Sequence, residues 1–231
     1  MHARILQYRN RWFCYLDLLG FKDLVRTADV GRVIELYDDV IAKLEAGAHA
    51  KKSLGISYSW FSDTFILFSR GETLQEFTFL EQAGRLFFQR LILSDIPVRG
   101  ALSHGKLYSN LERNIFIGEA LIEAYEYGEK QNWLGFLLTP SVHRRLSGSE
   151  LDVRSRYNYR PVLRKGIVTH QMPENVFAFA FNNGTVNGAN PLLSAIRRMK
   201  RNAPKHYQVK YVNTEQFILE HACRHISLPA T

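Results

Sequence analysis

The first half of the chain alternates between short apolar runs and segments with helical spacing. Residues 12–18, Trp-Phe-Cys-Tyr-Leu-Asp-Leu, form an apolar run that predicts a buried strand with Asp17 near its end. Gly20 interrupts this pattern, and a helix is predicted to begin near Phe21. Apolar side chains then recur at helical spacing over residues 30–46, which predicts an amphipathic helix.

Two strand-like runs come next, over residues 55–61 and 64–69. Only Ser62 and Asp63 separate them, and this spacing predicts a tight hairpin. Residues 97–108 predict a second hairpin that turns at Gly105.

Helices are expected to alternate with these strands. Thr73 and Glu76 have the spacing of a capping box, so a helix is predicted to begin there and to end near Leu93. The remaining elements are expected, in order, as a helix over 118–132, a strand over 134–138, a helix starting at Thr139-Pro140, a strand over 159–163, and terminal helices over 191–201 and 214–225.

This order of elements favours an α+β fold, an α/β sandwich with a mostly antiparallel sheet and helices on one side. A loop rich in Gly and Asn at residues 184–190 suggests a boundary. We therefore expect a main domain over residues 1–182 and a helical extension over 183–231, packed on the main domain.

Composition narrows the function classes. The chain has 231 residues, 46% of them hydrophobic, with no apolar run near 18 residues and no apolar stretch at its start, so neither a transmembrane helix nor a secretory signal is expected. Cys14 and Cys223 form no metal or disulfide pattern, which favours the cytoplasm.

The net charge of +8 invites a nucleic-acid interpretation, but its distribution weakens that interpretation. Residues 141–231 hold 14 of the 30 Lys and Arg and 5 of the 22 Asp and Glu, which leaves 16 basic and 17 acidic residues in 1–140. A basic nucleic-acid-binding protein stays open as a hypothesis, although it rests on charge alone and no aromatic-rich binding motif accompanies the charge. The cluster at residues 197–201 with Lys205 is either a solvated helix face or a regulatory surface.

Asp17 and Asp63 are the most informative polar residues, because each lies in or beside an apolar strand run. A charge at such a place is costly unless it is paired or bound to a metal ion. If their strands are neighbours, the two carboxylates would converge and suit Mg²⁺ or Mn²⁺ carrying a polyphosphate. The alternative is that each Asp only forms a turn or caps a helix.

Four motifs in order resemble the class III nucleotide cyclase catalytic domain over roughly residues 11–145. They are Asp17-Leu-Leu-Gly-Phe21, Ser62-Asp63 in a hairpin, Arg99-Gly-Ala-Leu-Ser-His-Gly105 and Gly118-Glu-Ala. The resemblance implies a ferredoxin-like core, two metal ions (Mn²⁺ or Mg²⁺), and active sites at the interface of a homodimer. It also implies metal binding by Asp17, Leu18 and Asp63, and a triphosphate wrapped by the backbone N–H groups of Leu18, Leu19, Gly20 and Phe21.

The chain departs from purine cyclases where they read the base. Those enzymes have a Lys at the position of Ser59, which has Tyr58 as its neighbour. They have an Asp or its equivalent at the position of Ile115, which has Asn114 as its neighbour. A smaller base would fit beside Ser59. The helix segment Gly118-Glu-Ala-Leu-Ile-Glu-Ala-Tyr-Glu126 resembles the bacterial antiphage (Pycsar-type) pyrimidine cyclases, which make cyclic CMP or cyclic UMP. The Asp-Leu-Leu-Gly-Phe form of the first motif also fits that group.

The helix after Gly118 departs as well. Ile122 and Glu126 stand at the positions of the Asn and Arg that stabilise the transition state in the family, so another cation must act, with Arg99 and Lys165 as candidates. The function expected from the resemblance is a pyrimidine nucleotide cyclase that converts UTP or CTP into a second messenger in antiphage defence. A purine cyclase with altered base reading, or a non-catalytic module that binds a nucleotide or a partner, remains the alternative.

Overall fold

A computed structural model describes residues 8–27, 31, 34–35, 38–39, 41–42, 55–151, 157–159, 176–179, 181 and 190–222. Most of the helix predicted over 30–46 lies outside these residues. The elements, in chain order, are β1 (Arg9–Leu18), α1 (Phe21–Thr27), β2 (Ser57–Phe61), β3 (Thr64–Phe68), α3 (Leu74–Leu93), β4 (Val98–Asn110), β5 (Ile115–Ile117), α4 (Glu119–Glu129), β6 (Phe136–Leu138), α5 (Pro140–Leu146), β7 (Tyr157–Tyr159), β8 (Phe177–Phe179), α6 (Pro191–Asn202), the short 3-10 helix η1 (Lys205–Tyr207) and α7 (Gln208–Ala222).

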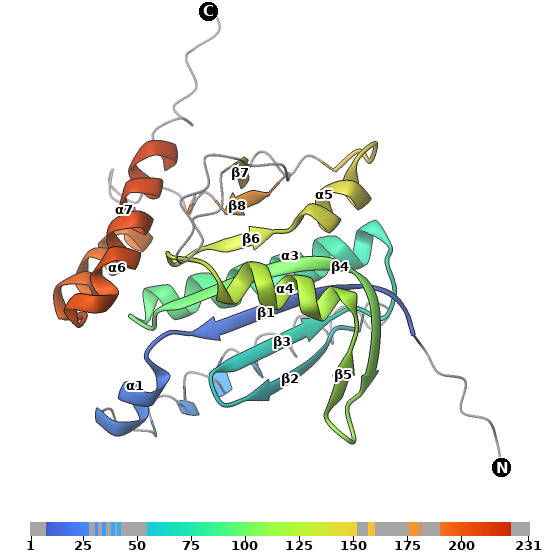
Figure 1. The fold of residues 1–231 in the computed structure, drawn as a ribbon, viewed down its shortest axis with the longest axis horizontal. Coiled ribbons are helices and arrows are strands. Elements are labelled where there is room, and N and C mark those ends of the chain that lie inside the picture. The colour runs from blue at the N-terminus through green and yellow to red at the C-terminus, as the bar shows by residue number, and fades with distance from the viewer. Residues whose placement is uncertain are drawn as a thin grey trace, which may run out of the picture.

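The strands form one mixed sheet of order β2-β3-β1-β4-β6-β8-β7, with β5 paired to the far end of β4 (Figure 1). Among the described strands, β4 and β6 pair in parallel and all other neighbours are antiparallel. The α+β fold class with a mostly antiparallel sheet is confirmed.

Helices cover both faces of the sheet, which corrects the prediction of helices on one side. Side chains of a strand alternate between its two faces. Trp12, Cys14 and Leu16 of β1 therefore pack with α3, whereas Phe13 and Tyr15 pack with α4. Figure 1 shows α4 in front of the sheet and α3 behind it.

The second predicted hairpin is wrong in its position. β4 continues through Gly105, which pairs with Arg11 of β1, and the chain reverses only after Asn110. Gly105 serves a packing need instead, because a Cβ atom there would lie 3.3 Å from the backbone nitrogen of Ala120 in α4. A glycine that permits close approach of a helix resembles a turn glycine when only the sequence is read.

Local signals located most helix starts correctly. Thr73 and Glu76 form the predicted capping box at the start of α3. Thr139 is at the N-cap position of α5 with Pro140 in the first turn, although the Thr139 hydroxyl makes no capping hydrogen bond to the backbone. The predicted strand over 159–163 begins earlier, at Tyr157, and its residues beyond Tyr159 lie outside the described part. α7 also begins six residues earlier than predicted, at Gln208.

The two C-terminal helices share the main hydrophobic core. Leu192 and Ile196 of α6 and Phe217 of α7 are fully buried in the same cluster as α3. The Trp133 ring packs edge-on against Phe217 with 4.6 Å between centroids, and the Thr214 hydroxyl accepts a hydrogen bond from the Leu134 amide (2.8 Å). These contacts fix α6 and α7 beside the end of the sheet where β1 finishes (Figure 1). No helix within the described residues has the length and apolar character needed to cross a membrane.

Candidate active site

The two aspartates singled out by the sequence lie at the same end of neighbouring strands. Asp17 pairs with Thr64 in the β1–β3 register, and Asp63 occupies the tight turn just before Thr64. The Leu18 amide donates a hydrogen bond to the Asp63 carbonyl (2.9 Å), which fixes this turn against the end of β1. Ser62 completes the turn in the left-handed region, at φ 56°. The predicted convergence of Asp17 and Asp63 thus has a structural basis in strand pairing.

Asp17 is buried and paired with Arg99. Burial raises the pKa of the Asp17 carboxyl above its ordinary value, Arg99 lowers it, and the negative charges of Asp63 and Glu129 raise it further. The Arg99 Nε donates to Asp17 Oδ2 (2.8 Å), and its Nη2 lies 2.7 Å from the same oxygen. Because Arg99 is directly opposite Asp17 in the β1–β4 register, sheet pairing itself creates this contact.

The other donors of Arg99 are also engaged. Nη1 donates to the Gln131 carbonyl (3.1 Å) and Nη2 to Glu129 Oε1 (3.1 Å). The side chain is 4% exposed. Arg99 therefore binds and orients acidic groups in a buried place, which differs from the exposed position that a direct contact with substrate phosphate would require.

The donor set at this end of the sheet fits a divalent cation that carries a nucleotide. Within the described residues, no group of three or more His, Cys, Asp and Glu side chains could hold a metal ion by itself. Magnesium in nucleotide sites is usually held by one or two carboxylates, with substrate phosphates and water completing its shell. Asp17 and Asp63 supply such a pair, and Arg99 compensates the charge of Asp17 when no cation is bound.

The turn after β1 offers fewer backbone amides to a phosphate than predicted. The Leu18 amide bonds the Asp63 carbonyl and the Leu19 amide bonds the Pro97 carbonyl (2.8 Å), so both are already used. Gly20 adopts φ 69°, a conformation that a residue with a side chain rarely takes, and α1 starts at Phe21. Of the four predicted amides, those of Gly20 and Phe21 remain for a phosphate.

A pocket of about 350 Å³ opens beside the two aspartates on the α4 face of the sheet. Tyr15 and Thr64, the neighbours of Asp17, line it, together with Ser59, Asn114 and Tyr125. The Ser59 hydroxyl donates to Asn114 Oδ1 (2.8 Å), which joins β2 to the turn before β5. This pair lies at the predicted base-reading position.

Two residues predicted for base reading lie elsewhere. Tyr58 alternates with Ser59 along β2 and therefore faces the α3 side, where its ring stacks on Phe65 with 6.1 Å between centroids. Ile115 is 37% exposed and does not line the pocket, because its neighbour Asn114, at φ 52°, turns toward Ser59. The pocket is therefore lined by Asn114, whereas the sequence predicted the next residue, Ile115.

On α4, the two positions compared with the transition-state Asn and Arg of the cyclases carry no group that could replace them. Ile122 is 57% exposed, and Glu126 pairs with Lys130 one turn later (3.2 Å). Lys165, the second predicted cation, lies outside the described residues. Gly118, the residue before α4, has no room for a side chain, because a Cβ atom would lie 2.1 Å from the Lys106 carbonyl oxygen.

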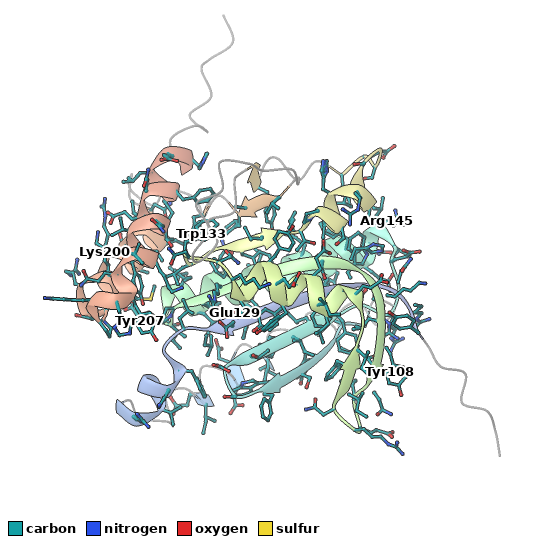
Figure 2. All side chains as sticks on the ribbon, in the orientation of Figure 1. Tyr108, Glu129, Trp133, Arg145, Lys200 and Tyr207 are labelled. Atoms are coloured by element: carbon teal, nitrogen blue, oxygen red, sulfur yellow. The ribbon has the colours of Figure 1, made fainter. Side chains whose placement is uncertain are left out.

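Sequence reasoning missed Glu129, Gln131 and Lys210 as partners in this site. Glu129 is at the end of α4 that points toward the C-terminal helices (Figure 2). The Gln131 carbonyl accepts hydrogen bonds from both Arg99 and Lys210 (3.1 and 3.3 Å). Lys210 is separated from Gln131 by 79 residues, so no local signal could have brought them together.

Comparison with solved structures identifies the fold. The chain is similar to the catalytic core of a rhodopsin-guanylyl cyclase with converted specificity, solved in complex with ATPαS (TM-score 0.54, 9% identity, 74% of this chain and 96% of that chain). It is also similar to a dimeric guanylyl cyclase domain of the RhoGC fusion protein from the aquatic fungus Blastocladiella emersonii (TM-score 0.53, 11% identity, 74% and 94%). A third similar structure is the adenylyl cyclase CyaB from P. aeruginosa (TM-score 0.51, 12% identity, 79% and 98%).

These similarities show that the chain has the fold of the class III nucleotide cyclase catalytic domain. No protein-family model matches the sequence, and no curated protein matches it. About a quarter of the chain lies beyond the part shared with the first two structures.

Proposed function

We propose that this chain is a nucleotide cyclase that converts a pyrimidine nucleoside triphosphate, CTP or UTP, into its 3′,5′-cyclic nucleotide and pyrophosphate. The observation that carries the proposal is the convergence of Asp17 and Asp63 beside the pocket that contains Ser59 and Asn114. The fold shared with guanylyl and adenylyl cyclases supports the reaction class.

In this reaction the ribose 3′-oxygen attacks the α-phosphorus and forms a new P–O bond. The bond from the α-phosphorus to the α–β bridging oxygen breaks, pyrophosphate leaves, and the 3′-hydroxyl proton passes to solvent water. Both reacting groups belong to one substrate, so holding them in line supplies much of the rate. Two Mg²⁺ or Mn²⁺ ions held by Asp17, Leu18 and Asp63 would lower the pKa of the 3′-hydroxyl and neutralise the triphosphate.

The protein's own residues have separate tasks in this proposal. The amides of Gly20 and Phe21 receive phosphate oxygens at the start of α1. Arg99 positions the Asp17 carboxylate, because its donors are directed at Asp17, Glu129 and a carbonyl. This assignment replaces a direct role of Arg99 on the α-phosphate, and Lys165 remains the candidate for that role.

The base is proposed to bind in this pocket beside the hydrogen-bonded pair of Ser59 and Asn114. The Ser59 hydroxyl donates to the Asn114 side-chain oxygen, so the Asn114 amide group keeps its two N–H donors for a ligand. Pyrimidines present ring carbonyl oxygens that accept such bonds. Tyr15 and Tyr125 supply aromatic surface in the same pocket, and their rings pack edge-on with 5.6 Å between centroids.

We also propose a homodimer across the α4 face. Large apolar side chains are exposed on this face, with Phe61 of β2 at 75% and Ile122 and Tyr125 of α4 at 57% and 45%. Exposed apolar residues that gather on one face mark an interaction surface. Sedimentation velocity should give a dimer for the wild type and a monomer for Ile122→Glu, whereas a monomeric wild type would refute this part.

The reaction is tested by incubating the protein with Mn²⁺ and each of the four nucleoside triphosphates, followed by mass spectrometry of the products. Cyclic CMP or cyclic UMP is expected from the wild type, and at least about 100-fold less from Asp63→Asn. Cyclic AMP or cyclic GMP as the main product would refute pyrimidine selection but keep the cyclase. If a folded protein forms no cyclic nucleotide from any of them, the enzymatic proposal fails.

A non-catalytic nucleotide-binding module is the second candidate, favoured by Ile122 and Glu126 on α4 and by the charge pairing of Asp17 with Arg99.

The last part of the proposal is that the cyclic product acts in defence against phage. Cells that carry the wild-type chain with its effector should resist phage, and cells with Asp63→Asn should be sensitive. Equal resistance in both would favour the non-catalytic module.

A further inference from the structure

A second pocket, of about 510 Å³, lies where the C-terminal helices meet the end of β1. Three parts of the chain that are far apart in sequence form its walls: the turn after β1, the loop between α3 and β4, and the segment from α6 to α7. Apolar and aromatic side chains dominate its lining, which includes Leu19, Pro97, Met199, Ala203, Tyr207 and Tyr211. Its volume is in the range of pockets that hold small molecules.

Tyr211 brings an unpartnered hydroxyl group to this pocket. The residue is 6% exposed, yet its hydroxyl makes no hydrogen bond to any residue that the structure describes. A buried tyrosine hydroxyl usually has a partner, because the loss of its water without replacement costs free energy. The hydroxyl is not completely enclosed by protein atoms, so a molecule in the pocket can reach it.

Tyr207, one helical turn earlier, lines the same pocket, and its hydroxyl likewise has no hydrogen bond within the described part of the chain. Figure 2 shows Tyr207 on the side of the C-terminal helices that faces the rest of the molecule. Burial and, to a smaller extent, the neighbouring Tyr207 raise the pKa of Tyr211 to about 12. The Tyr211 hydroxyl therefore keeps its proton at neutral pH and can donate a hydrogen bond to an oxygen of a ligand.

The charged side chains in the lining are already engaged. Asp95 accepts two hydrogen bonds from Arg198 (3.0 and 3.2 Å), and the Lys210 ammonium donates to the Gln131 carbonyl (3.3 Å). A ligand with a net charge would leave water for largely apolar walls, where these lining charges already have partners, and this transfer is costly. The walls therefore favour an uncharged ligand.

We propose that this pocket binds an uncharged, flat aromatic molecule with a carbonyl oxygen, which accepts a hydrogen bond from the Tyr211 hydroxyl. The Tyr207 ring and the Pro97 and Met199 side chains suit the flat body, because aromatic rings and the Met thioether pack well on an aromatic surface. A nucleoside triphosphate does not suit these walls, so the pocket is a second site and not an extension of the candidate active site.

One wall of the pocket belongs to the candidate active site. Leu19 and Gly20 line the pocket, and they lie between Asp17 and the proposed phosphate amide of Phe21. The Leu19 amide also bonds the carbonyl of Pro97, another lining residue (2.8 Å). A ligand that packs against Leu19 and Pro97 would hold this turn in one position, so occupation of the pocket should change the rate of the proposed reaction. This regulatory part rests on the proposed function, whereas ligand binding does not.

The binding test uses three probes with similar flat bodies. Coumarin is an uncharged bicycle with a ring carbonyl, naphthalene is a bicycle without a polar atom, and coumarin-3-carboxylate adds one negative charge to coumarin. Dissociation constants are obtained from ligand-observed NMR titrations of the full chain and of three variants. Tyr211→Phe removes one hydroxyl, Ala203→Trp fills the pocket, and Tyr108→Phe is the matched control on β4, far from Tyr207 in Figure 2. Circular dichroism and thermal unfolding establish that each variant is folded.

Tyr211→Phe should weaken coumarin about fivefold and leave naphthalene unchanged, because one neutral hydrogen bond is lost. Ala203→Trp should weaken both probes about tenfold or more, and Tyr108→Phe should match the wild type. Coumarin-3-carboxylate should bind the wild type more weakly than coumarin does.

Four results overturn the proposal. They are a wild type that does not bind coumarin, an unchanged coumarin affinity in Tyr211→Phe or in a folded Ala203→Trp, an equal loss of coumarin and naphthalene in Tyr211→Phe, and tighter binding of the carboxylate than of coumarin. The first, third and fourth need no variant that might fail to fold beyond the conservative Tyr211→Phe.

The regulatory part is measured separately, as cyclic nucleotide formation with and without coumarin. A change of rate in the wild type that is absent in Ala203→Trp supports coupling, and an unchanged rate at saturating coumarin overturns it. If the wild type forms no cyclic product, the proposed function fails, and the comparison of the three probes still decides whether the pocket binds its ligand.

Discussion

The guanidinium of Arg99 on β4 holds the carboxylate of Asp17 on β1, with 2.7 Å between Nη2 and Oδ2. The two residues face each other in the strand register, so the pair forms as soon as β1 and β4 pair. Both side chains are nearly inaccessible, at 4% and 11% exposed. The same carboxylate is the best candidate for a metal ligand. The contact with Arg99 therefore contributes both to the stability of the sheet and to the position of the proposed metal ligand.

Arg99→Met should destabilise the fold strongly. Removal of one partner of a buried pair leaves an uncompensated charge, which costs about 3–5 kcal/mol. The free energy of unfolding is measured by urea denaturation. Arg198→Met is the matched control, because its pair with Asp95 has 44% and 47% exposed side chains and is expected to contribute at most about 1 kcal/mol. Equal losses in the two variants would contradict a buried role for Arg99.

Asp63→Asn should lower the proposed cyclase activity while leaving the free energy of unfolding nearly unchanged. Asp63 lies in a half-buried turn where its main chain, not its carboxylate, makes the bond to Leu18. Stability is therefore expected to stay within about 0.5 kcal/mol of the wild type. Mn²⁺-dependent cyclic nucleotide formation should fall by about 100-fold or more, since even the outer partners of metal ligands contribute 10–100-fold. Activity close to that of the wild type would remove Asp63 from the metal site.

Asn114→Asp should alter base recognition without disturbing the turn. Asp tolerates the left-handed conformation found at Asn114, but it replaces two N–H donors by an acceptor. The loss of a hydrogen bond that reads the substrate should lower kcat/KM for the preferred pyrimidine triphosphate by about tenfold. Ile115→Val, at the neighbouring position outside the pocket, is the control and should behave as the wild type. Equal kcat/KM values for all three proteins would place the base elsewhere.

His104 should make the protein less stable at mildly acidic pH. Burial lowers the pKa of His104 below its ordinary 6.5, although Glu72, 2.9 Å from Nε2, opposes this shift. The unfolded chain then binds the proton more readily than the folded chain, so stability falls as pH drops through 6.5 toward the lower value of the folded state. In His104→Gln, stability should fall less between about pH 7.5 and pH 5.5. Parallel pH profiles of wild type and variant, from urea denaturation, would refute this.

Gly128→Ala should destabilise the protein although alanine favours helices. In an exposed helix interior this change would stabilise by about 1 kcal/mol. Here a Cβ atom would lie 2.7 Å from the Tyr15 ring, where α4 meets β1, and overpacking typically costs about 1–3 kcal/mol. A raised melting temperature would show that α4 can move away from the sheet.

The sequence located elements wherever the signal was local. The capping box of Thr73 and Glu76, the Thr139-Pro140 start and the two-residue turn at Ser62-Asp63 all depend on neighbours within a few positions, and each is found in the structure. Gly105 misled the prediction, because it lies within a strand, closely packed against the distant α4, and not in a turn.

The sequence by itself therefore determined the order of the elements up to α5 and the positions of Asp17 and Asp63 at strand ends, since strand periodicity and turn chemistry are local properties. Only the tertiary structure decided which side chains meet. Sheet pairing sets Arg99 against Asp17, alternation along β2 sends Tyr58 away from the pocket that Ser59 enters, and packing of the C-terminal helices brings Lys210 to Gln131. These contacts join residues up to 82 positions apart, and their partners are fixed by register and packing, which no local pattern encodes.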